Sequence, residues 1–183
     1  LLSKATSLMD IYKENSQNAF NAFLSSSVKT KASRRRILFS LPIHTISNNL
    51  LFKILKHNNV SAESIKAIQE SVEFQKEIFK DTIGQNVIED EISILSKEEF
   101  EKSKPFLFLA DIFYDKRIYY TYEEYLEHID LTKKYEKENK NYKISVNNNN
   151  TFKNIQILVC EKNWVMISKA NSPSIHFVIH HPK

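Results

Sequence analysis

Apolar residues recur at helical spacing through the first part of the chain. Residues 4–24 carry apolar positions three, four and seven residues apart, and residues 47–57 repeat this pattern behind a capping serine. After an Asn-Asn turn signal, a third helix is expected at residues 61–82. Its apolar stripe can pack against a core or against a second subunit, and it consists of Ile65, Ile68, Val72 and Phe79.

Shorter apolar runs predict strands. Residues 37–41 and 106–113 are candidate strands, and residues 87–95 alternate around three acidic residues, as an edge strand does. After residue 141 the chain contains four short runs rich in β-branched residues, at 142–146, 155–160, 164–169 and 175–180. Short connections favour antiparallel neighbours. The pattern predicts an α+β fold, with a helical N-terminal half containing a few strands and a C-terminal antiparallel sheet of about four strands.

Helix boundaries carry local signals. Ser96 with Glu99 and Thr121 with Glu124 have the spacing of capping boxes, which begin helices. Gly84 is the single glycine, and it is expected to end the third helix. Phosphate cradles, dinucleotide-binding fingerprints and nucleophile elbows all require glycines at sharp turns or close approaches. The glycine content therefore excludes these motifs.

Charge is nearly balanced along the chain. The 26 basic and 22 acidic residues leave a net charge of +4, which does not predict nucleic-acid binding over the whole surface. A basic cluster at residues 29–36 is expected to be an exposed connector, either a solvated linker or, through Arg34, Arg35 and Arg36, a contact to nucleic-acid phosphates. These patterns divide the chain into an N-terminal helix with the basic connector (1–33) and a single α+β effector domain (34–183).

The compartment is indicated by few features. Cys160 is the single cysteine, so the chain has no internal disulfide, which fits a cytoplasmic protein. No apolar run approaches the length of a membrane span, and no membrane partner is expected. The chain begins with Leu1 rather than Met, and further residues are expected before it.

Aromatic residues are the strongest candidates for a ligand site. An apolar pocket with a few polar groups is the usual form of a small-molecule site. The sequence predicts ligand binding by Tyr114, Tyr120, Tyr125 and Trp164. The alternative is that these rings belong to the core.

Other chemical groups have simpler interpretations. Glu124 and His128 lie four residues apart on a helix, which suits a metal or a proton relay but also an ordinary surface pair, and the second interpretation is favoured. Cys160 is expected to be a buried thiol, and residues 89–91 to be an acidic edge that opposes aggregation. The histidines at 176, 180 and 181 are expected at the surface. No metal and no cofactor are predicted.

Three segments carry a resemblance to a known family. They are residues 119–128 (YYTYEEYLEH), residues 141–142 (NY) and residues 175–182 (IHFVIHHP). With them, residues 35–183 resemble the C-terminal effector halves of helix-turn-helix transcription regulators from low-GC Gram-positive bacteria. The resemblance implies a DNA-binding module outside this chain, and it assigns no site residue.

The leading hypothesis is therefore a regulatory effector domain that senses a small molecule or a peptide and forms a homodimer. One alternative is a ligand-free structural or interaction module. The other is a small enzyme that uses Glu124, His128 or Cys160.

Overall fold

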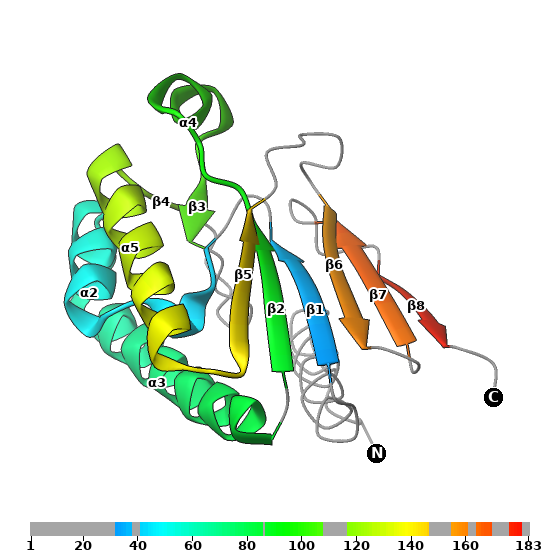
Figure 1. Cartoon of the computed structure of the whole chain (residues 1–183). Coiled ribbons are helices and arrows are strands. Elements are labelled where there is room, and N and C mark those ends of the chain that lie inside the picture. Colours follow the sequence, from blue (N-terminus) through cyan, green and yellow to red (C-terminus); the bar gives the residue numbers. More distant parts are fainter. Residues whose placement is uncertain are drawn as a thin grey trace, which may run out of the picture.

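A six-stranded mixed sheet with helices on one face forms the body of the protein (Figure 1). The computed structural model describes residues 32–37, 41–85, 87–107, 117–146, 155–160, 164–169 and 176–180. The strand order is β5-β2-β1-β6-β7-β8, and a second, two-stranded sheet pairs β3 with β4. The α+β class predicted from the sequence is confirmed.

The sheet has a parallel half and an antiparallel half. The parallel half consists of β1 (Ala32–Ile37), β2 (Val87–Ile92) and β5 (Tyr142–Val146). The antiparallel half joins β1 through β6 and consists of β6 (Ile155–Cys160), β7 (Trp164–Lys169) and β8 (His176–His180). The small sheet pairs β3 (Phe106–Leu107) with β4 (Ile118–Tyr119).

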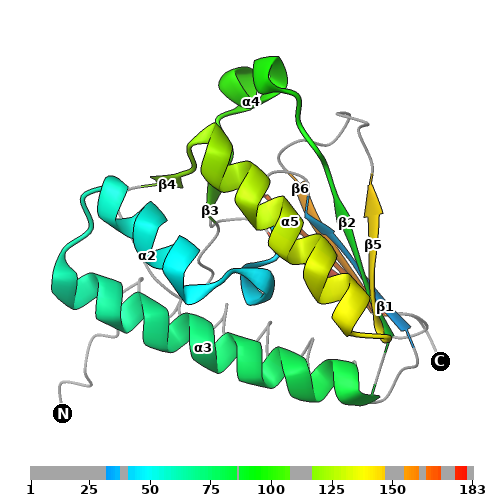
Figure 2. The same ribbon diagram turned by 60° about the vertical axis from the view of Figure 1, so that its left-hand side comes forward.

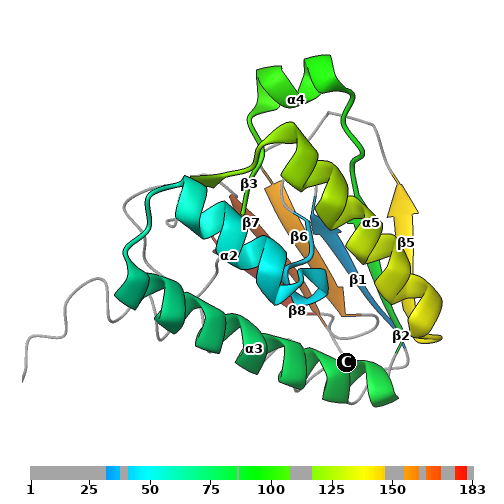
Figure 3. The same ribbon diagram turned by 90° about the vertical axis from the view of Figure 1, so that its left-hand side faces the viewer.

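Helices fill the connections between the parallel strands. Between β1 and β2 lie the 3-10 turn η1 (Ile43–Thr45), α2 (Asn48–His57) and α3 (Ala62–Gln85). Between β2 and β5 lie α4 (Lys97–Ser103), the small sheet and α5 (Tyr122–Glu138). Parallel neighbours require such crossovers. Figure 3 shows α2, α3 and α5 in front of one face of the sheet.

The predicted four-stranded C-terminal sheet is wrong in one respect. The run at 142–146 forms β5, which pairs in parallel with β2 at the opposite side of the sheet from β6, β7 and β8. The preceding helix α5 provides the crossover that a parallel pairing needs, whereas the short connections from β6 to β8 give antiparallel neighbours as predicted. Three of the four runs are therefore consecutive antiparallel strands, and they extend the main sheet.

Two charged segments predicted to be exposed lie inside the sheet. Residues 34–36 belong to β1, which pairs with β2 on one side and with β6 on the other, so this part of the basic cluster is not a connector. Residues 89–91 belong to β2, which lies between β1 and β5 and is not an edge. The register aligns the two segments residue by residue, Arg34 with Glu89, Arg35 with Asp90 and Arg36 with Glu91.

The predicted division between residues 33 and 34 falls within β1, which begins at Ala32.

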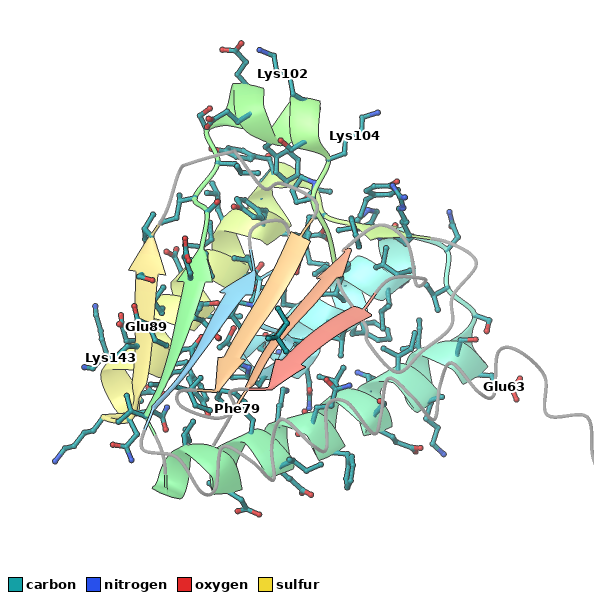
Figure 4. The ribbon with its side chains drawn as sticks, turned by 90° about the vertical axis from the view of Figure 1, so that its right-hand side faces the viewer. Glu63, Phe79, Glu89, Lys102, Lys104 and Lys143 are labelled. Atoms are coloured by element: carbon teal, nitrogen blue, oxygen red, sulfur yellow. The ribbon has the colours of Figure 1, made fainter. Side chains whose placement is uncertain are left out.

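Asp90 is completely buried on the helix-covered side and accepts a hydrogen bond of 2.6 Å from the hydroxyl of Tyr142. Glu89 is aligned with Lys143 on β5, and both are labelled in Figure 4.

The core lies between the helices and the sheet. On α2, Leu50, Leu51, Ile54 and Leu55 are at most 1% exposed. The predicted stripe on α3 is confirmed, and it is buried against this chain's own core. Asn59, with φ of 56°, makes the predicted turn between the two helices.

Capping residues act as predicted, whereas Gly84 does not. Ser47 caps α2, and both capping boxes are formed with the reciprocal hydrogen bonds expected of them. Gly84 lies within the last turn of α3 and has no positive φ, so it does not terminate the helix in the left-handed conformation. A Cβ added there would meet no atom within 4 Å.

Of the predicted strand at 106–113, residues 106–107 form β3, and residues 108–116 lie outside the described part of the chain. Among the described helices, none has the length and apolar character needed to cross a membrane.

Candidate functional site

The carboxyl ends of the parallel strands meet at one edge of the sheet. Around this edge lie α4, the β3–β4 pair and the N-terminal end of α5 (Figures 1 and 2). Ligands of open α/β sheets bind outside the carboxyl ends of the strands. A ligand site is therefore expected at this edge of the sheet.

Four aromatic rings gather there and form the aromatic cluster of Phe100, Tyr120, Tyr122 and Tyr125. The Phe100 ring centroid lies 5.3 Å from that of Tyr122 and 5.4 Å from that of Tyr125. Tyr120 and Tyr125 are 6.0 Å apart in a T-shaped arrangement. Such edge-to-face contacts add stabilisation beyond the buried area. Tyr122 is half-buried, and the other three rings are buried.

The hydroxyl of Tyr125 connects α5 to the end of β2. It donates a hydrogen bond of 2.7 Å to the carbonyl of Ser93 and accepts one of 3.3 Å from the N–H of Leu95. Burial raises the pKa of Tyr125 to about 12, although the bond from Leu95 acts in the opposite direction. The phenol is therefore neutral at physiological pH.

Tyr120 connects the aromatic cluster to a buried histidine. Its hydroxyl lies 2.9 Å from Nδ1 of His128, whose Nε2 lies 3.2 Å from the carbonyl of Pro42. Because a carbonyl only accepts, Nε2 carries the proton and Nδ1 accepts from the tyrosine. Burial lowers the pKa of His128 to about 3, and burial also raises the pKa of Tyr120 well above its usual value.

Two threonines extend this network between η1 and α5. Oγ1 of Thr45 lies 3.1 Å from Nε2 of His128 and 2.7 Å from Oγ1 of Thr132. Thr45 also donates to the carbonyl of Pro42, and Thr132 donates to the carbonyl of His128. The neutral imidazole is thus held on both sides by polar groups that water does not reach.

The interpretation of Glu124 and His128 as a surface pair is wrong. Glu124 is 1% exposed and His128 is completely buried. Glu124 accepts from the N–H of Thr121 through Oε2, and its Oε1 lies 3.1 Å from Nδ1 of His57. The two residues face the core because α5 packs against α2 and η1, which helical spacing by itself does not reveal.

His57 was not predicted as a site residue. It lies at the end of α2 with its side chain 38% exposed, and its ring also lies 3.3 Å from the amide nitrogen of Asn58. Asn58 in turn exchanges hydrogen bonds with the backbone of Tyr119 on β4. The pair of His57 and Glu124 depends on the packing of two helices that are distant in sequence, and no local pattern marks it.

The predicted ligand residues are only partly brought together. Tyr120 and Tyr125 are in contact, and Tyr114 lies outside the described residues. Trp164 is the first residue of β7 and pairs with Cys160 on β6. Cys160 in turn pairs with Ser33 near the amino end of β1. The backbone register thus places Trp164 at the opposite end of the sheet from the aromatic cluster.

The predicted alternative of an enzyme needs Cys160 near Glu124 and His128. Cys160 is paired near the amino end of β1, whereas His128 contacts Pro42, beyond the carboxyl end of the same strand. A six-residue strand is about 17 Å long. The backbone positions therefore do not bring the three residues together.

The remaining candidates are placed by their strands. Arg34, Arg35 and Arg36 are aligned with acidic residues on β2, as described above. His176 and His180 lie at the two ends of β8, and His181 is outside the described part. Within the described ranges, no group of three or more His, Cys, Asp or Glu residues can hold a metal ion.

Comparison of the chain with family models, with curated proteins and with solved structures gave no match.

Proposed function

We propose that the chain is the regulatory effector domain of a bacterial transcription regulator, which acts in the cytoplasm. It binds a small aromatic molecule or a peptide side chain at the aromatic cluster and pairs with a second copy. DNA is bound by a module outside this chain. The observation that carries the proposal is the gathering of Phe100, Tyr120, Tyr122 and Tyr125 at the carboxyl edge of the parallel strands.

The chemistry of the aromatic cluster suits an aromatic ligand. Aromatic faces stack on planar groups, and the half-buried ring of Tyr122 is the member of the cluster nearest to solvent. Close by, the guanidinium of Arg117 lies 5.5 Å from the ring centroid of Phe106, which shows that a cation can sit against an aromatic face in this region.

The connections of α5 provide a route for a response. Its N-terminal half is hydrogen-bonded to α2 through Glu124, to η1 through His128 and to the segment after β2 through Tyr125. A ligand that moves the N-terminal half of α5 changes all three contacts together. Allosteric coupling requires an element whose arrangement changes when a ligand binds at one site, and α5 would be that element.

Thermal unfolding with a panel of aromatic acids, amines and nucleobases tests the proposal. A ligand at a hundred times its dissociation constant adds about 2.7 kcal/mol to the free energy of unfolding. Tyr122→Ala should abolish the shift, whereas Phe74→Ala on the exposed side of α3 should leave it intact. The proposal fails if no compound shifts the melting temperature, or if both variants reduce the shift equally.

A second candidate is a ligand-free interaction module. It is favoured by the hydroxyls of Tyr120 and Tyr125, which already bond to groups within the chain. In that case the aromatic cluster is part of the core, and the panel produces no shift.

A further inference from the structure

The two outer strands of the main sheet differ in how their edges are protected. β5 and β8 are the terminal strands in the sheet order. An outer strand leaves backbone N–H and C=O groups available to another chain, and proteins usually oppose such pairing with lysines, prolines or covering groups.

The β5 edge carries two such devices. Lys143 places a charged residue in the strand. The backbone N–H of Ile144 donates a hydrogen bond of 2.8 Å to the carboxylate of Glu136 on α5. This N–H is therefore already bonded and is not available to a further strand. A second strand would have to displace this carboxylate, which opposes pairing at β5.

Among the residues that the structure describes, neither device is found at the β8 edge. Its sequence is His-Phe-Val-Ile-His, without Lys, Arg, Asp, Glu or Pro inside the strand. Ile179 is 60% exposed, and in the described part of the chain β8 pairs with β7 alone. Figure 4 turns this side of the sheet toward the viewer. An exposed apolar edge without a protecting charge is suited to strand addition.

The order of residues in β8 suits pairing with a second copy of this chain. In an antiparallel pair centred on Val178, Phe177 of one chain is opposite Ile179 of the other, and His176 is opposite His180. In this register each apolar residue of one strand is aligned with an apolar residue of the other, and each histidine is aligned with a histidine. A two-fold interface requires this kind of self-complementarity.

We propose that two copies of the chain associate through antiparallel pairing of their β8 strands, which joins the two sheets into one continuous sheet. This inference rests on the proposed effector function, which includes a homodimer, and it names the surface that forms it. Pro173 and Pro182 flank the strand in the sequence, and proline lacks the backbone N–H that strand pairing uses.

Sedimentation equilibrium of the whole chain without ligand tests the interface, with two matched variants. The wild-type protein should have twice the chain mass of 21.5 kDa. Ile179→Lys should reduce the mass twofold, whereas Val146→Lys, at an exposed position on β5, should remain dimeric. Circular dichroism shows whether each variant folds. A monomeric wild-type protein, or dissociation by Val146→Lys but not by Ile179→Lys, would overturn the proposal.

Disulfide trapping tests the register without depending on the lysine variant. In a Cys160→Ser background, Val178→Cys lies on the two-fold axis and should crosslink two chains on oxidation, whereas Ser145→Cys on β5 should not. Absence of a Val178→Cys crosslink, or an equal crosslink from both variants, contradicts the pairing. A dimer that binds no compound of the panel counts against the effector function alone. A monomer stabilised by a ligand counts against the interface alone.

Discussion

The buried imidazole of His128 should make the protein sensitive to mild acid. Its pKa is lowered from 6.5 to about 3, with burial as the main cause. Below pH 6.5 the unfolded chain therefore takes up a proton that the folded chain does not. The stability associated with the neutral imidazole is complete above pH 6.5 and is lost as the pH falls toward 3.

The magnitude follows from proton linkage. Each pH unit in this window lowers the free energy of unfolding by at most about 1.4 kcal/mol for one group, which amounts to roughly 2 kcal/mol between pH 6.5 and 4.5. Typical domains have about 5–15 kcal/mol in total, so the effect is a substantial fraction.

Urea unfolding of the wild-type protein and of His128→Gln measures the effect. Glutamine offers a donor and an acceptor to the partners of His128 but does not titrate. We expect the wild-type protein to be more stable than His128→Gln near pH 7. The difference between their free energies of unfolding should shrink by at most about 1.4 kcal/mol per pH unit below 6.5. The carboxyl groups titrate in both proteins, so they largely cancel in this difference.

Two results would refute this reasoning. One is an equal pH dependence of the two proteins between pH 6.5 and 4.5. The other is an NMR titration in which the His128 ring takes up its proton near pH 6.5 in the folded state. Either result would mean that the imidazole is accessible to water or is held by a group that favours its charge.

Three further predictions concern α3 and α5. Gly84→Ala should raise the free energy of unfolding by about 0.5–1 kcal/mol in thermal denaturation, because the position is helical, exposed and without a positive φ. Thr121→Ala should lower it by about 1 kcal/mol, measured by urea unfolding, because it removes the cap of α5. Tyr125 should contribute little phenolate absorbance at pH 10–11 in the folded protein. Because its pKa is raised to about 12, the stability it contributes is present below pH 10 and is lost as the pH rises toward 12.

Local signals in the sequence predict local structure well in this protein. The capping boxes at Ser96 and Thr121 depend on atoms three residues apart, and both begin helices as expected. The α3 stripe is likewise a property of one helix. Gly84 is the exception, because α3 continues past it for one further residue. The sequence by itself does not distinguish a glycine that is tolerated inside a helix from one that ends a helix.

Features that depend on pairing or packing could not be predicted from local patterns. The basic residues 34–36 and the acidic residues 89–91 each look exposed in isolation, and only the parallel register of β1 and β2 aligns them inside the sheet. His57 meets Glu124 because α2 packs on α5 across 67 residues of sequence. The density of aromatic residues indicated Tyr120 and Tyr125 correctly as neighbours, but the direction of β7 places Trp164 at the other end of the sheet.

The most direct test of the account is amide chemical-shift mapping with any compound that stabilises the protein. If the aromatic cluster is the ligand site, the largest changes should fall on α4, on residues 120–125 and on the segment after β2 that bonds to Tyr125. Smaller changes should extend to His57 and Thr45, which α5 contacts. Changes confined to β6, β7 and β8, or to the exposed side of α3, would contradict the central claim.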